Sequence, residues 1–202
     1  MRESKKIKDY FFFQEGPGVR NYQYTEKGVK LLNVANLVNG NLYLDNSNRY
    51  ISEEEAFGKY SHFLCDEGDL IIASSGIKAE YFDRKMGIVG SNMLPLCMNT
   101  STIRFKVLNK KVINLKYFMY YLKSRHFKNQ LTKNMTGSAQ LNFGPSHLER
   151  MNFIYFKNEE QEKIVNILQK IDSLINVKND ELEKYDQLVK SQFVNEVCVW
   201  KS

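Results

Sequence analysis

Apolar residues near the C-terminus recur at alternating intervals of four and three residues, the pattern of a helix that buries one side. The repeating positions are Ile164, Leu168, Ile171, Ile175, Leu182, Tyr185 and Val189. Lys178 and Gln192 interrupt this seam where the repeat predicts apolar side chains. Neither glycine nor proline occurs between Lys157 and Ser202. The pattern therefore predicts one helix of roughly 37 residues, roughly 55 Å long.

The start of this helix is marked by polar residues. Asn158 with Gln161 three residues later resembles a capping box, and Glu159 and Glu160 match the positive end of the helix dipole. A second apolar stripe widens the face, and it consists of Ile167, Leu174 and Leu188. A rod of this length cannot bury both stripes on its own domain, so we expect a partner helix. The alternative is a helix folded back on its own domain.

Short apolar runs bounded by turn residues fill the chain from Arg2 to Val107, which indicates β-strands. Strands are predicted at Lys30–Val34, Leu70–Ala73 and Ile103–Val107. Ser52 and the three glutamates after it predict a short helix that ends near Phe57. Apolar residues near helical spacing predict one further helix from Asn114 to about Thr132.

The predicted fold class is α/β (α+β), with one compact β-rich domain over residues 1–156 and a long coiled-coil-type helix over residues 157–202. Charge follows the same division. Residues 1–156 hold 22 Lys and Arg against 14 Asp and Glu, whereas residues 157–202 hold 7 against 9. We therefore expect a polyanion such as DNA to bind the first part and a protein to bind the second. A basic surface that only aids solubility is the alternative.

Residues that carry enzymatic chemistry are missing from the sequence. The three cysteines are scattered without a CxxC pair, so we expect no metal site and no cofactor. There is no phosphate-binding GxxxxGK[ST] motif, no Asn/Asp-Pro-Pro-aromatic motif of amino methyltransferases and no Pro-Asp…Glu-x-Lys nuclease cluster. The histidines are isolated from one another. No signal peptide or long apolar run occurs, so we expect a cytoplasmic protein that does not enter a membrane.

Three loop-like segments combine cations, which neutralise phosphates, with amides and hydroxyls, which read base edges. The first contains Arg20, Asn21, Tyr22 and Gln23. The second contains Ser74, Ser75, Gly76 and Lys78, with Arg84 further along. The third contains Lys133, Thr136, Gly137, Ser138 and Gln140. The predicted helix before the third segment adds cations at Lys123, Arg125 and Lys128. An ordinary surface loop is the alternative for the first segment, and a strand-end turn for the second.

The order of motifs in the C-terminal third resembles a known family. The loop Thr136-Gly137-Ser138-Ala139-Gln140 is followed by a short apolar strand and then by Glu160-Gln161, which opens the long helix. Further matching positions are Ile164-Val165, Leu168, Ile171-Asp172, Leu182, Leu188, Lys190-Ser191 and Phe193. This order resembles one half of a specificity subunit of type I restriction–modification enzymes. The residues Phe156-Lys157-Asn158 stand where that family usually has prolines.

The resemblance implies a half-length specificity subunit with one target-recognition domain. Such a chain reads one part of a split DNA target, without catalysis of its own, and docks methyltransferase subunits and, through them, restriction subunits. The helix would pair with a second copy or with another specificity chain. The resemblance also implies that Thr136–Gln140 holds the DNA backbone or shapes the domain, because the loop is common to members that read different sequences.

Two other functions are compatible with the residues. The chain is then either a stand-alone methyltransferase or nuclease with a degenerate motif, or an interaction protein that binds a methyltransferase subunit and no longer reads DNA. Methyl transfer by the purified chain would identify the first. DNA binding without a steep salt dependence would favour the second.

Overall fold

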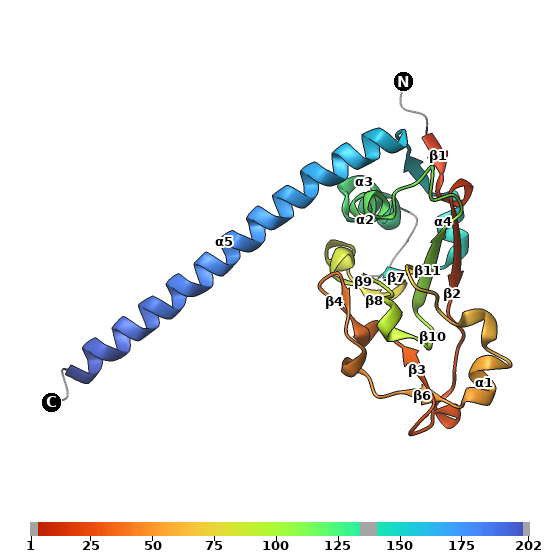
Figure 1. Ribbon diagram of the computed structural model, residues 1–202, viewed down its shortest axis with the longest axis horizontal. Helices are drawn as coiled ribbons and strands as arrows, with labels where there is room; N and C mark the ends of the chain where they lie inside the picture. The colour runs from red at the N-terminus through yellow and green to blue at the C-terminus, as the bar shows by residue number, and fades with distance from the viewer. Residues whose placement is uncertain (1–3, 134–140, 200–202) are drawn as a thin grey trace. The chain divides into compact units, whose positions relative to one another are not determined.

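A computed structural model describes residues 4–133 and 141–199 of the chain. It divides into two units, Met1–Asn158 and Glu159–Ser202, and each is described by itself. The first unit is rich in short strands and the second is a single long helix (Figure 1). The expected fold class is therefore confirmed. The boundary follows Asn158, whereas the sequence pattern predicts it after Phe156.

An antiparallel sheet of four strands lies at the centre of the first unit, in the order β2-β11-β7-β9. Its strands are β2 (Phe11–Glu15), β11 (Thr102–Val107), β7 (Leu70–Ala73) and β9 (Met86–Ile88). All four residues of β7 are buried, which explains why this strand is a continuous apolar run rather than an alternating one. The predicted strands at Leu70–Ala73 and Ile103–Val107 are confirmed.

A second sheet contains three strands in the order β10-β3-β6. They are β10 (Leu96–Met98), β3 (Val29–Leu32) and β6 (Tyr50–Ile51). β10 runs parallel to β3, and β6 runs antiparallel to it. The predicted strand Lys30–Val34 is present but ends at Leu32. After Leu32, the backbone N–H of Asn33 donates a hydrogen bond to Asn36 Oδ1 at 2.8 Å. A 3-10 turn therefore begins in place of the strand.

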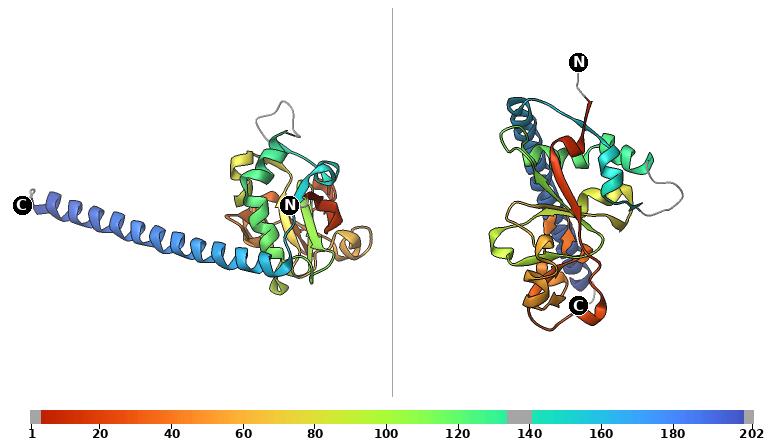
Figure 2. Two further views of the ribbon diagram at one scale, coloured as in Figure 1. Left: turned by 90° about the horizontal axis from the view of Figure 1, so that it is seen from above. Right: turned by 90° about the vertical axis from the view of Figure 1, so that its right-hand side faces the viewer.

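Shorter elements complete the first unit. Three antiparallel strand pairs join β1 (Ser4–Lys6) to β13 (Asn152–Ile154), β4 (Leu37–Val38) to β5 (Asn41–Leu42), and β8 (Ser75–Ile77) to β12 (Leu141–Asn142). The 3-10 helices are η1 (Ile7–Asp9), η2 (Asn21–Gln23), η3 (Val34–Asn36), η4 (Leu44–Asn46), η5 (Ser61–Phe63), η6 (Ala79–Arg84) and η7 (Ser91–Met93). Figure 2 shows the helix α4 (Pro145–Arg150) beside β2.

Two predictions about helices meet different outcomes. The short helix α1 (Glu53–Phe57) is confirmed, because the Ser52 hydroxyl caps it by accepting a hydrogen bond from Glu55 N at 3.2 Å. The prediction of a single helix that begins at Asn114 is wrong. The structure has α2 (Leu115–Lys123) and α3 (Arg125–Lys133), with Ser124 in an extended conformation between them. The Ser124 hydroxyl donates to Tyr121 O at 2.6 Å and accepts from Phe127 N at 3.2 Å, so it ends one helix and caps the next.

Aromatic side chains pack α2 against the central sheet. Phe118 stacks on Phe11 with ring centroids 3.8 Å apart, and Phe153 meets both rings edge-on. Tyr121 packs against Phe153 with its ring and donates its hydroxyl to Asn152 O. Tyr117 donates to Ile154 O at 2.7 Å. The cluster therefore fixes β13 to α2 by both apolar packing and hydrogen bonds.

The second unit is α5 (Asn158–Val199), a helix of 42 residues. At about 1.5 Å per residue it is about 63 Å long. Ile164 and Leu168 are half-buried. The later seam residues are exposed at 45% for Ile171, 51% for Ile175, 63% for Leu182, 64% for Tyr185 and 65% for Val189. An apolar seam this exposed is unfavourable in water without a covering partner.

Candidate DNA-binding surface

The segment after Gly18 presents three of its four predicted residues to solvent. Arg20 and Asn21 are exposed, and the Tyr22 side chain is 87% exposed. Gln23 instead is half-buried and bound to residues within the protein. Its amide nitrogen donates to Glu55 Oε1 at 2.6 Å and to the Tyr60 hydroxyl at 3.0 Å, and its oxygen accepts from Arg20 N at 3.0 Å. The Gln23 amide therefore holds the loop to α1, and Arg20, Asn21 and Tyr22 remain for an external ligand.

The segment around β8 forms one side of a basic pocket. The pocket is about 350 Å³ in volume and is lined by Gly76, Ile77, Lys78, Tyr81, Arg84 and Lys85. Gly76 has a φ of +73°, which favours glycine, and no atom lies within 4 Å of the position of a Cβ there. We call this set the basic pocket. It brings together Gly76, Lys78 and Arg84 of the second predicted segment, but Ser74 lies outside it, buried and hydrogen-bonded to Glu15 Oε1 at 3.2 Å. Ser75 is half-buried.

The electrostatics of the basic pocket favour an anion. Three of its six lining residues carry a positive charge and none is acidic. The Arg84 guanidinium lies 5.0 Å from the Tyr81 ring centroid, an arrangement that holds the cation in place. The nearby carboxylate of Asp83 is paired with Lys128 at 2.6 Å. Asp83 therefore does not neutralise the pocket cations, and their charge can attract a phosphate or another anion.

The cations of α2 and α3 have different roles. Lys128 also donates to Glu80 O at 3.0 Å, so it fastens α3 to η6 rather than facing solvent freely. The Lys123 amine lies 5.3 Å from the Tyr120 ring centroid and is half-buried. Arg125 and Lys133 are exposed. The break at Ser124 divides this set, so it does not form the continuous basic stripe that one helix would have presented.

The loop with the best family resemblance falls outside the described part of the chain. Thr136, Gly137, Ser138 and Gln140 all lie in the range 134–140, which the structure does not describe. Their assignment to DNA remains a prediction.

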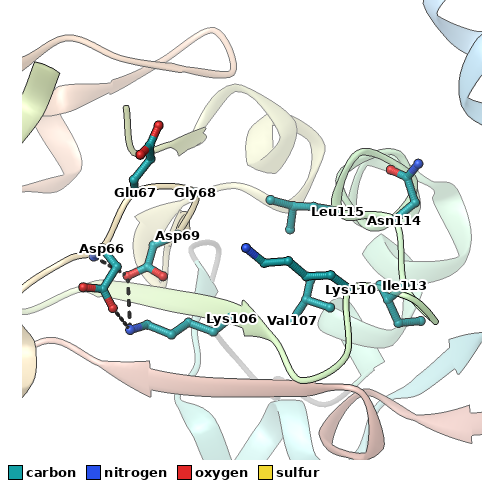
Figure 3. A pocket seen from close by; sticks show the side chains of 10 residues that line it. All are labelled: Asp66, Glu67, Gly68, Asp69, Lys106, Val107, Lys110, Ile113, Asn114 and Leu115. Carbon is teal, nitrogen blue, oxygen red and sulfur yellow. Dashed lines mark hydrogen bonds and ion pairs between the residues drawn. The ribbon is translucent and has the colours of Figure 1, made fainter. Parts of the chain in front are cut away.

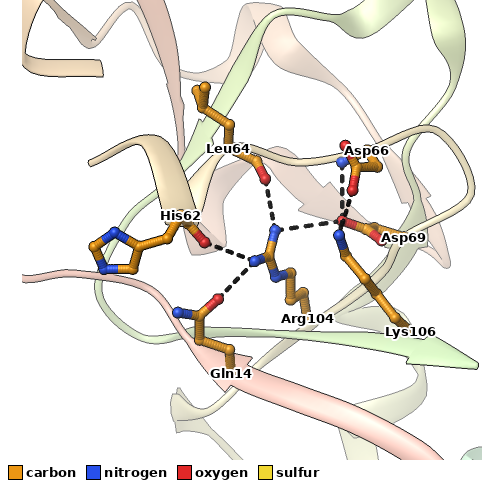
Figure 4. A network of polar contacts seen from close by, with 7 residues as sticks. All are labelled: Gln14, His62, Leu64, Asp66, Asp69, Arg104 and Lys106. Carbon is orange, nitrogen blue, oxygen red and sulfur yellow. Dashed lines mark hydrogen bonds and ion pairs between the residues drawn. The ribbon is translucent and has the colours of Figure 1, made fainter. Parts of the chain in front are cut away.

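A buried polar network surrounds Asp69, which with Gly68 forms the turn before β7 (Figure 4). Arg104 is buried and donates to Leu64 O at 2.5 Å, His62 O at 2.7 Å and Gln14 Oε1 at 2.7 Å. Asp69 lies 3.7 Å from Arg104, and burial raises the pKa of its carboxyl. Asp69 also accepts from Asp66 N at 2.9 Å, which closes the turn at Gly68. Asp69 therefore ties the start of β7 to Arg104 of β11.

A larger pocket next to this network does not suit DNA. It is about 540 Å³ in volume and is lined by Asp66, Glu67, Gly68, Asp69, Lys106, Val107, Lys110, Ile113, Asn114 and Leu115 (Figure 3). Lys106 forms an ion pair with Asp66, and its hydrogen bond lowers the pKa of that carboxyl. Three carboxylates against two lysines repel a phosphate. The larger pocket is therefore not the candidate site.

Sequence reasoning missed Tyr81 of the basic pocket and a polar groove elsewhere in the domain. The aromatic pair Tyr81-Phe82, which stands just before the basic pair Arg84-Lys85, could have indicated Tyr81. A groove lined by amides and hydroxyls lies at the edge of the three-stranded sheet. The asparagine-rich run Asp45–Arg49 is the sequence feature that could have indicated that groove.

Neither a metal-binding cluster nor an exposed thiol at Cys65 or Cys97 occurs in the part of the chain that the structure describes. Within 4–133 and 141–199, no group of three His, Cys, Asp or Glu side chains is placed to hold a metal ion. The thiols of Cys65 and Cys97 are buried, and burial raises the pKa of each to about 12. Both thiols are therefore protonated and unreactive at neutral pH. In the same part of the chain, none of the helices has the length and apolar character that crossing a membrane requires.

Comparison with known proteins identifies relatives of both units. Residues 3–184 match the family described as the Type I restriction modification DNA specificity domain. The specificity subunit of the type I restriction enzyme MjaVIII from Methanocaldococcus jannaschii is 26% identical over 192 residues. That alignment covers 93% of this chain and 43% of the relative.

Two solved structures share the fold. The HsdS subunit from Thermoanaerobacter tengcongensis has a TM-score of 0.64 at 13% identity, over 87% of this chain and 38% of that one. The S subunit of a type I restriction–modification system from M. genitalium has a TM-score of 0.54 at 18% identity, over 85% of this chain and 39% of that one. This chain thus spans less than half the length of these relatives. Specificity subunits are non-catalytic components of restriction–modification complexes. From the match over residues 3–184, the chain belongs to the family of type I restriction–modification DNA specificity proteins.

Proposed function

We propose that this chain recognises one part of a split DNA target for a type I restriction–modification enzyme. The observation that carries the proposal is the match of residues 3–184 to the DNA specificity family. The β-rich domain, residues 1–156 as the sequence divides it, is the part that binds double-stranded DNA. The basic pocket supports this role, because three clustered cations without an acid suit the DNA backbone.

The helix of residues 157–202 is proposed to hold two recognition domains together. A single domain of this size reads few base pairs, so useful specificity needs a second domain. The exposed seam that begins at Ile171 supports a helical partner, because two such faces would remove each other's apolar side chains from water. The partner is a second copy of this chain or another specificity chain, and an antiparallel pair would read an inverted repeat with an unread gap.

Catalysis is proposed to belong to other subunits. In this role the chain docks methyltransferase subunits, which bring the methyl donor, and through them restriction subunits, which cut DNA. The chain itself uses no cofactor and no metal, and it works in the cytoplasm, where its DNA and its partners are.

A binding experiment across a salt series tests the proposal. We expect the full chain to bind duplex DNA with an affinity that falls steeply and linearly in a plot of log K against log salt. We also expect no methyl transfer by the chain alone, and transfer at a defined sequence once the methyltransferase subunit is added. Transfer by the isolated chain, or DNA binding insensitive to salt, would contradict the proposal.

A further inference from the structure

Three chain segments converge at one edge of the three-stranded sheet. β3 and β10 are parallel, so the residues after Leu32 and after Met98 leave the sheet at the same edge. β6 is antiparallel to β3, so the residues before Tyr50 enter at that edge too. The hydrogen bond from Leu31 N to Arg49 O, 2.9 Å long, holds the entering segment in place. Residues far apart in the sequence therefore meet there.

These segments line a polar groove about 610 Å³ in volume. Its lining residues are Asn33, Val34, Ala35, Asn46, Ser47, Asn48, Arg49, Thr100 and Ser101. We call it the amide groove. Seven of the nine residues carry an amide, hydroxyl or guanidinium group, and none is acidic. The basic pocket holds three cations, whereas the amide groove holds one. The two sites therefore differ in chemistry: the first suits phosphate charge and the second suits hydrogen-bonding edges.

Hydrogen bonds of the Asn33 side chain fix the inner wall of the amide groove. Buried Asn99 donates from its amide to Asn33 Oδ1 at 2.9 Å. Asn33 donates to Leu31 O at 3.0 Å and to Ser47 Oγ at 3.2 Å. Ser101 adopts a φ of +65°, an unfavourable conformation for a residue with a side chain. Such strain is concentrated at functional sites, where the surrounding structure enforces it.

The rim of the groove holds the side chains that face outward. Asn46, Asn48 and Arg49 are all exposed. The Arg49 guanidinium lies 5.2 Å from the Tyr24 ring centroid, and Nη1 lies 3.5 Å from the Tyr24 hydroxyl. Asn48 accepts from Lys30 Nζ at 3.3 Å through Oδ1. Asn46 donates from Nδ2 to Ala35 O at 3.4 Å. Each rim side chain is therefore oriented from one side, while the rest of its donors and acceptors are open to a ligand.

We propose that the amide groove reads base edges in the major groove of DNA, with Arg49 specifying a guanine and Asn46 or Asn48 an adenine. The inference rests on the proposed function and names the residues that set the target. An arginine fork matches O6 and N7 of guanine, and a carboxamide matches N6 and N7 of adenine. The contact with the Tyr24 ring and hydroxyl holds the Arg49 fork in position before DNA arrives, which reduces the ordering required on binding.

Selection from a randomised duplex library tests this assignment. The full chain and the variants Arg49→Lys, Arg49→Ala and Asn48→Ala are compared for bound sequences and for the salt dependence of affinity. We expect Arg49→Lys to keep the charge and the salt slope but to lose discrimination at one guanine by about 10- to 100-fold, because lysine lacks the fork. Asn48→Ala, or Asn46→Ala tested in the same way, should relax one adenine position by a similar factor.

A matched control distinguishes recognition of bases from binding of the DNA backbone. Lys85→Ala, in the basic pocket, should weaken binding to all sequences alike and leave the selected sequence unchanged. If every rim variant selects the wild-type sequence with wild-type discrimination, the amide groove is not the reading site. If the wild-type chain itself selects no sequence, the proposed function fails and this inference with it. Thermal unfolding midpoints equal to that of the wild type show that each variant is folded.

Discussion

Polar side chains that could bind DNA are in several places bound to partners within the protein instead. Gln23, Ser74 and Lys128 all have groups that bind DNA in other proteins. In this structure the Gln23 amide is bonded to Glu55 and Tyr60, the Ser74 hydroxyl to Glu15 and the Lys128 amine to Asp83 and Glu80. At the residue scale, the availability of a polar group decides its role more than its type does.

Replacing cations of the basic pocket should weaken DNA binding without changing the preferred sequence. We expect Lys78→Ala and Lys85→Ala each to reduce the slope of log K against log salt by about 1, because each removes one phosphate contact. Lys8→Ala, at an exposed lysine of η1, is the control and should leave the slope unchanged. Unchanged slopes in the pocket variants would place the DNA backbone elsewhere. Fluorescence anisotropy across a salt series measures both quantities.

Stability should depend on the aromatic cluster rather than on exposed aromatic residues. Phe118 is fully buried between Phe11 and Phe153, so Phe118→Ala should lower the free energy of unfolding by about 3–5 kcal/mol. Tyr22→Ala, at a side chain that is 87% exposed, should change it by no more than about 0.5 kcal/mol. Urea unfolding followed by circular dichroism measures both. Similar losses for the two variants would contradict this account of the core.

Elements in this chain end where side chains take over backbone hydrogen bonds. Ser124 separates α2 from α3, and Asn36 ends the predicted strand after Leu32. Both residues favour helix caps and turns because their short polar groups reach nearby backbone atoms. In α5 no glycine or proline occurs, and the helix runs from Asn158 to Val199. Its apolar seam is the feature of this element that requires a partner.

Charged residues in that seam should separate the proposed pair of helices. Ile171→Asp with Leu182→Asp places two carboxylates where apolar side chains would meet, so we expect a monomer with a folded recognition domain. Ser173→Asp with Gln187→Asp adds the same charge at positions about 200° around the helix from the adjacent seam residues, so this control should keep the wild-type oligomeric state.

Size-exclusion chromatography with light scattering distinguishes the outcomes. A wild-type monomer at tens of micromolar would rule out the homodimer and leave pairing with a different specificity chain as the proposal. A seam variant that stays dimeric would place the contact on another face of the molecule.

The whole molecule combines a recognition domain with a rod, and the proposal requires both. If two copies pair through antiparallel helices, the selected DNA should be an inverted repeat with a gap of fixed length. The seam variant Ile171→Asp with Leu182→Asp should select only one half of that repeat, with lower affinity, because the second domain no longer binds in the same complex. Sequencing of selected duplexes checks this result. An asymmetric wild-type target would contradict pairing of identical chains.

Sequence alone determined the features that depend on local order. The spacing of apolar residues predicted α5, the Ser52 cap predicted α1, and the continuous apolar run predicted β7. The motif order from Thr136 to Phe193 indicated the family that the match over residues 3–184 shows. These features follow from helix geometry, capping and burial, which act over a few neighbouring residues.

Tertiary structure decided which polar residues come together and which remain free. The amide groove joins segments near Asn33, Asn48 and Thr100, because parallel and antiparallel pairing brings their strand ends to one edge. Gln23 is occupied by partners 32 and 37 residues away, and Arg104 by one 90 residues away. Contacts at such separations depend on how strands pair and helices pack, and no local pattern of hydrophobic and polar residues specifies them.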